Sequence, residues 1–108
     1  MGGYVYLICD PSNDWFKIGV TTGKIENRIK ELQTGNGSEL FIKDYFKCDY
    51  PFKLEKMLHT KFMPKRVMNE WFNLTIDDII HFKDSCIELN ETINCLKENP
   101  FFIKKRLT

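Results

Sequence analysis

The chain contains 108 residues, enough for one domain built around one hydrophobic core. Hydrophobic residues account for 43% of the sequence. Neither a run of about 18 apolar residues nor a signal-peptide pattern occurs, so we expect an intracellular protein that spans no membrane. The formal net charge of +1 does not by itself indicate any class of partner.

The N-terminal third predicts a β-hairpin followed by a helix. Residues 3–9 and 15–21 are rich in β-branched and aromatic side chains, and the segment between them contains the turn formers Asp, Pro, Ser and Asn. A helix is expected over residues 22–34 with Thr22 as its cap. The apolar positions of this helix recur on one face. They are Ile25, Ile29 and Leu32.

The middle of the chain predicts a third strand and a second helix. Residues 39–48 have alternating apolar positions, and the alternation slips near Lys43 and Asp44, which indicates a β-bulge. Pro51 suits the first turn of a helix, and Pro64 is expected to end that helix.

After the second helix the sequence predicts a short extended segment over residues 70–74, followed by a long amphipathic helix over residues 76–97. Thr75 and Asp78 have the spacing of a capping box at its start. The apolar side chains expected to face inward are Ile76, Ile79, Ile80, Cys86, Ile87, Ile93 and Leu96.

The order ββαβαα predicts an α/β (α+β) fold with a small, antiparallel three-stranded sheet flanked by helices. We expect a single domain over residues 1–99, with its motifs in residues 3–74, and a basic aromatic tail over residues 100–108. Cys9, Cys48, Cys86 and Cys95 are expected to be reduced thiols, because no Cys-x-x-Cys spacing supports a structural zinc site.

Five polar positions stand out by their spacing: Tyr6, Lys17, Arg28, Glu55 and Glu70. Val5-Tyr6 lies on the first strand, Lys17-Ile18-Gly19 on the second, Arg28 in the first helix, and Glu55 in the second helix, where it opens a Glu-x-x-Leu run that ends at Pro64. The set resembles the GIY-YIG nuclease superfamily. It is most similar to the small phage and viral branch called the phage open-reading-frame 172, or meiotically up-regulated gene 113, type.

The resemblance implies a metal-dependent endonuclease that hydrolyses DNA phosphodiester bonds with one Mg²⁺ or Mn²⁺ ion. Glu55 would be the metal ligand, and Arg28 would hold phosphate oxygens through its planar fork. Tyr6 would act as general base or position the water. We expect the ammonium group of Lys17 to lower the pKa of Tyr6.

Further residues are secondary candidates for this site: Tyr4, Gln33, His59, Asn69 and Glu70. Glu70 is the second choice for a metal carboxylate. A basic middle of the chain is expected to contact DNA through Lys43, Lys47, Lys53, Lys56, Lys61, Lys65 and Arg66.

Structural roles remain open for the same side chains. Tyr6 can be a core residue, and Arg28 can pair with Glu26 or Glu31 along its helix. Likewise, Glu55 can pair with His59. A separate alternative has Glu70 paired with Arg66.

Two alternative functions also remain. Val20 and Leu32 stand where related nucleases often have Lys and Tyr or His, which favours a DNA-binding module that has lost turnover. The acidic helix over residues 76–97 and the aromatic, basic tail are instead consistent with a virus-encoded protein-interaction domain.

Overall fold

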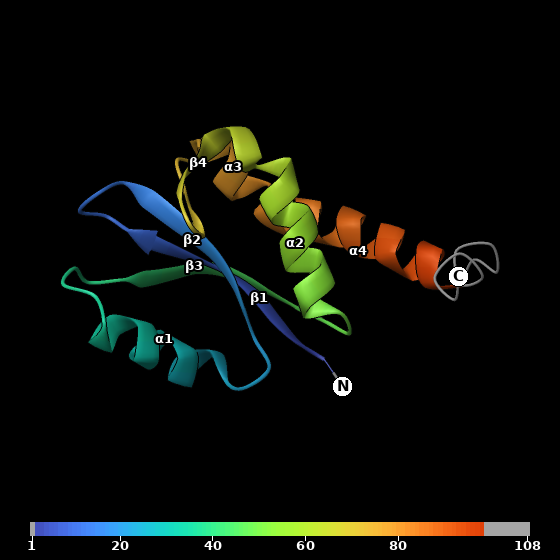
Figure 1. The fold of residues 1–108 in the computed structure, drawn as a ribbon, viewed down its shortest axis with the longest axis horizontal. Coiled ribbons are helices and arrows are strands. Elements are labelled where there is room, and N and C mark those ends of the chain that lie inside the picture. Colours follow the sequence, from blue (N-terminus) through green and yellow to red (C-terminus); the bar gives the residue numbers. More distant parts are fainter. Residues whose placement is uncertain (1, 99–108) are drawn as a thin grey trace.

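The computed structural model of the chain describes residues 2–98, so the predicted tail lies outside the described residues. The strands are β1 (Gly3–Asp10), β2 (Trp15–Thr21), β3 (Phe41–Cys48), β4 (Arg66–Met68) and β5 (Trp71–Phe72). The helices are α1 (Ile25–Thr34), α2 (Pro51–Lys61), the 3₁₀ turn η1 (Met63–Lys65), α3 (Ile76–Ile80) and α4 (Phe82–Glu98). Figure 1 shows α1 apart from the other helices, which gather on the opposite side of the sheet.

The sheet has five antiparallel strands in the order β3-β1-β2-β5-β4. The α+β class is therefore confirmed, but the predicted three-stranded sheet is too small. The segment 70–74 is extended as expected, and its two-residue strand β5 pairs with β2 on one side and with β4 on the other. Strands this short carry almost no periodic signal, so neither the pairing nor β4 is visible in the sequence.

Two local predictions are confirmed. The register of β1 against β3 shifts so that Leu7 faces Asp44 and Ile8 faces Ile42, which leaves Lys43 as the extra residue of a bulge. Thr75 accepts a hydrogen bond from the backbone N–H of Asp78, and the Asp78 carboxylate accepts one from the backbone N–H of Thr75. This is the predicted capping box.

The predicted cap of the first helix was wrong. The helix begins at Ile25 with Lys24 as the N-cap residue, and no side chain caps it. The hydroxyl of Thr21, not Thr22, accepts the backbone N–H of Gly23 at 3.1 Å. This contact closes a turn just before the helix, and the helix therefore begins at Ile25 and not directly after Thr22.

The prediction of a single long helix over residues 76–97 was also wrong, because the helix breaks at His81 between α3 and α4. The break places Phe82 in the core, where it is fully buried. Ile76 and Ile80, expected to face inward, are 76% and 68% exposed. Ile87 and Leu96 are partly exposed as well, whereas Cys86 and Ile93 are buried as predicted.

The two faces of the sheet carry different side chains. Val5, Leu7 and Phe16 belong to the larger apolar cluster, which packs against α2 and α4. The alternate residues Tyr6 and Ile8 belong to a smaller cluster that also includes Ile25 of α1. Since successive strand residues point to opposite faces, one set of strands supplies both surfaces.

Two further findings concern the cysteines and the helices of the described chain. The four cysteines are free, as predicted, and burial raises the pKa of Cys86 to about 12. Within residues 2–98, no helix combines the length and apolar character that a membrane span requires.

Candidate active site on the α1 face of the sheet

Tyr6 occupies the centre of the candidate site because of its partner on β2. The residue paired with Tyr6 across the two strands is Gly19, and the Tyr6 side chain lies over it. A Cβ atom at position 19 would lie 2.4 Å from the Tyr6 hydroxyl oxygen and 2.5 Å from ring atom Cζ. The glycine of the Lys17-Ile18-Gly19 motif is therefore required to make room for the tyrosine ring.

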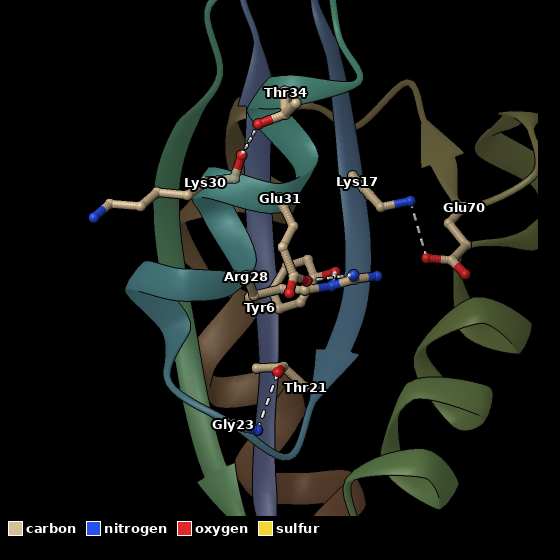
Figure 2. A network of polar contacts seen from close by, with 9 residues as sticks. All are labelled: Tyr6, Lys17, Thr21, Gly23, Arg28, Lys30, Glu31, Thr34 and Glu70. Atoms are coloured by element: carbon tan, nitrogen blue, oxygen red, sulfur yellow. Dashed lines mark hydrogen bonds and ion pairs between the residues drawn. The ribbon is translucent and has the colours of Figure 1, made fainter.

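The Tyr6 hydroxyl is buried and is bonded to Arg28. The Nε–H of Arg28 donates to the Tyr6 oxygen at 3.3 Å, and Nη1 of Arg28 lies 3.1 Å from a carboxylate oxygen of Glu31 (Figure 2). Of the open alternatives, the Arg28–Glu31 pair is thus present, and Tyr6 is a core residue with 1% of its surface exposed. The structure joins Tyr6 and Arg28 directly.

Burial raises the pKa of Tyr6, and the hydrogen bond and positive charge of Arg28 offset this rise only in part. The carboxylates of Glu70 and Glu55 raise the same pKa further. The expectation that Lys17 lowers the pKa of Tyr6 was therefore wrong. The cation beside the phenol is Arg28, and the net shift has the opposite sign.

Lys17 is on the same face of the sheet but points toward Glu70. Its Nζ atom lies 3.1 Å from a Glu70 carboxylate oxygen and 5.6 Å from the centroid of the Trp71 ring. Figure 2 shows the Lys17 side chain directed toward Glu70 and away from the phenol. Glu70 consequently pairs with Lys17, not with Arg66 as the alternative proposed. Trp71 also packs against the small apolar cluster that contains Tyr6.

Glu55 reaches the same region from α2. Its side chain is partly buried, and burial raises its pKa, followed by the negative charge of Glu70. The charges of His59 and Lys17 lower it. These four groups are close enough to influence one another, although they come from α2, β2 and the residue just before β5.

His59 is anchored to the backbone of β2. Its Nε2 atom is 2.8 Å from the carbonyl oxygen of Ile18, so this nitrogen carries the donated proton, and the ring packs edge-on against Phe72. The carbonyl contact, and not a hydrogen bond to Glu55, fixes the ring.

Three secondary candidates have structural settings. The side chain of Gln33 donates to the carbonyl oxygen of Ser38 and accepts the N–H of Leu40, both at 2.7 Å, which ties α1 to the start of β3. Asn69 has a positive φ of 50° in the turn between β4 and β5. Tyr4 stacks edge-on against Tyr45.

The predicted DNA-contacting cations lie on several elements. Lys65 forms an ion pair with Asp78, so its charge is already matched. The other six are exposed: Lys43, Lys47, Lys53, Lys56, Lys61 and Arg66. Their role in DNA binding remains a prediction.

Within the described part of the chain, no group of three or more His, Cys, Asp or Glu side chains is arranged to hold a metal ion. The donor chemistry near Glu55 nevertheless suits Mg²⁺, which keeps several waters and binds through one or two carboxylates. Burial and the negative charge of Glu70 raise the pKa of Glu55, and a bound cation would favour its ionised form.

In a comparison with protein families, residues 3–89 match a family described as the T5orf172 domain. Comparisons with curated proteins and with solved structures found no significant match.

Proposed function

Because the chain belongs to the T5orf172 domain family, a family of nuclease-like or DNA-binding modules, we propose that it is a metal-dependent endonuclease that hydrolyses DNA phosphodiester bonds. The observation that carries the proposal is the contact between Arg28 and Tyr6 on one face of the sheet, with Glu55, Lys17 and Glu70 beside it. Hydrolysis of a phosphodiester needs a group that holds phosphate and groups that support the developing negative charge.

Arg28 is the phosphate-holding group. Tyr6 accepts a hydrogen bond from Nε and so fixes the plane of the guanidinium, which leaves the Nη atoms to face a phosphate. In the free protein Nη1 contacts Glu31, whose side chain is 66% exposed. The Glu31 carboxylate occupies a place that a phosphate oxygen takes when DNA binds.

Glu55 is the residue that would hold the ion. A hard divalent cation there would stabilise the negative charge of the phosphoryl transition state and lower the pKa of water. The carboxylate of Glu70 adds to the negative potential at Glu55, and the ion pair of Glu70 with Lys17 offsets part of it. These two acidic side chains come from α2 and from the turn just before β5, so their meeting depends on the fold.

Tyr6 acts in this proposal chiefly by position. A phenol with a pKa above its ordinary value is almost entirely protonated at neutral pH, since the unshifted value is already about 10. We therefore infer that Tyr6 orients Arg28 and the attacking water. The shape of the pH–rate profile tests whether Tyr6 also accepts a proton.

The test is incubation of the purified protein with supercoiled plasmid in the presence of Mg²⁺, Mn²⁺ or EDTA. We expect nicked or linear product with either metal and none with EDTA. The matched variant Glu55→Gln keeps the size of the side chain and should leave only background cleavage. Full cleavage by Glu55→Gln would contradict the assignment of the metal to Glu55.

A second candidate function is a DNA-binding module without turnover. The burial of Tyr6 and the engagement of Lys17 by Glu70 favour it, because neither side chain is free for proton transfer. In that case the intact protein binds a duplex oligonucleotide and never cuts it with either metal. The affinity should then fall with rising salt, with a log–log slope of about −0.9 for each phosphate contact.

A further inference from the structure

A groove separate from the candidate active site lies between α2 and α4. It has a volume of about 660 Å³ and is open to solvent on one side. Figure 1 shows α2 crossing α4, whose C-terminal half continues beyond the sheet. The apolar residues of its lining are Met57, Leu89, Ile93 and Leu96. The polar residues of its lining are Thr60 and three lysines: Lys53, Lys56 and Lys61.

The groove faces away from the proposed catalytic residues. Successive residues of an α-helix turn by roughly 100°, so Lys53 and Met57, each two positions from Glu55, lie roughly 160° around the α2 axis from it. Helix α2 therefore presents Glu55 and His59 to the candidate site and the groove residues to a different side.

The chemistry of the lining selects the occupant. Of the described residues that line the groove, none is acidic, and Lys56 and Lys61 are exposed there. None of these lining residues is aromatic either, and single-stranded bases usually stack on aromatic rings. An apolar lining with lysines instead matches a helix with leucine-like side chains on one face and acidic side chains at its borders.

We propose that the α2–α4 groove binds an acidic amphipathic helix of a partner protein. Apolar side chains of the partner fill the space above Ile93 and Leu96, and its carboxylates pair with Lys56 and Lys61. The two helices of the groove supply the walls, as in other complexes in which a helix lies in a preformed groove. Residues 99–108 are a less suitable occupant, because Lys104, Lys105 and Arg106 would add like charge beside the lysines.

The test uses a synthetic, fluorescein-labelled helical peptide with leucines on one face and glutamates on both flanks. The controls are a scrambled peptide of the same composition and a peptide with lysines in place of the glutamates. Fluorescence anisotropy with the full chain should show saturable binding of the acidic helix and no comparable binding of either control. A peptide that never binds, or a scrambled peptide that binds equally well, would overturn the proposal.

Two groove variants and one control locate the binding. Leu96→Asp and Lys56→Glu should each weaken the affinity about tenfold or more, whereas Lys47→Glu on β3 should leave it nearly unchanged. Leu96 is already 40% exposed, and circular dichroism will verify that its variant is folded. Because Leu96 is remote from Arg28, Leu96→Asp should cleave plasmid as the unmodified protein does.

Two other occupants give distinct results. If Lys56→Glu abolishes binding of an oligonucleotide while the acidic peptide never binds, the groove is a nucleic-acid surface and the proposal fails. If the peptide binds only to a Phe101→Asp/Phe102→Asp variant, the chain's own C-terminal segment is the occupant, and the proposal again fails.

Discussion

The two faces of the sheet are made by alternate residues of the same strands, yet they differ in almost every physical property. On the α2–α4 face, fourteen buried residues of the described chain form one apolar cluster. On the α1 face only four are buried in a cluster, and one of them, Tyr6, carries a hydroxyl bonded to Arg28. Beside them lies the ion pair of Lys17 with Glu70.

This difference separates stability from chemistry within one small sheet. The apolar face removes large side chains from water, which is the main favourable term in folding. The α1 face keeps charged groups close together, where they interact with one another. Substitutions on the first face should therefore act on folding, and substitutions on the second on activity.

The largest expected effect tests the apolar face. Phe82→Ala removes a fully buried ring and should lower the free energy of unfolding by about 3–5 kcal/mol. Ile29→Ala, on the half-buried face of α1, should cost about 1–2 kcal/mol. Urea denaturation followed by circular dichroism gives both values. Equal losses would remove the distinction between the two faces.

The second prediction concerns Arg28. Arg28→Lys keeps the positive charge but loses the planar fork and the Nε–H that Tyr6 accepts, so plasmid cleavage should fall about 10²–10³-fold. The free energy of unfolding should change by less than about 1 kcal/mol, since Arg28 is partly exposed. Cleavage at an unchanged rate would show that the Tyr6–Arg28 contact is only structural.

Gly19→Ala tests the close contact between the two strands. The new Cβ meets the hydroxyl and Cζ of Tyr6, and the overpacking should cost about 1–3 kcal/mol and displace Arg28 from its partner. Gly23→Ala is the matched control, because the nearest atom there is 3.8 Å away. The melting temperature and the rate of plasmid cleavage should both fall for Gly19→Ala, and neither should fall for Gly23→Ala.

The pH dependence of stability tests the setting of Glu55. Burial and the charge of Glu70 raise the pKa of Glu55, so the folded state binds a proton more tightly than the unfolded state. This contribution to stability is present below the ordinary glutamate pKa and is lost as the pH rises through the raised one. The melting temperature of the unmodified protein should therefore fall relative to that of Glu55→Gln as the pH rises from about 4 to 7.

Metal binding extends the same experiment. Mg²⁺ should raise the melting temperature of the unmodified protein at neutral pH, because a cation bound only to the folded state stabilises it. Glu55→Gln should show no such rise. A parallel rise in both proteins would mean that the ion binds elsewhere.

The smallest expected effect concerns the Lys17–Glu70 pair. Glu70→Gln should cost less than about 1 kcal/mol of stability, because 43% of the glutamate side chain is exposed. It should also tighten DNA binding about two- to fivefold, since Lys17 is released and a negative charge near the phosphate is lost. Cleavage that instead falls to background would make Glu70 the metal ligand.

The predictions that succeeded depend on neighbours in the chain. The hairpin, the bulge at Lys43 and the capping box of Thr75 with Asp78 are set by contacts within a few residues or by simple alternation. The break at His81 was missed because the apolar pattern runs through it without interruption. Only the packed core shows that Phe82, and not Ile80, is the buried side chain.

The candidate site shows the same division. The sequence by itself supplied Tyr6, Arg28 and Glu55 as candidates, because their order and spacing are properties of a linear pattern. Which charge meets which was decided by the tertiary structure: Arg28 reaches the Tyr6 phenol, and Lys17 reaches Glu70. Burial, which sets the direction of the pKa shifts of Tyr6 and Glu55, likewise exists only after β2 pairs with both β1 and β5 and α2 packs beside them. Electrostatic interactions depend on distance and solvent exposure, and neither quantity is contained in the spacing of residues along a chain.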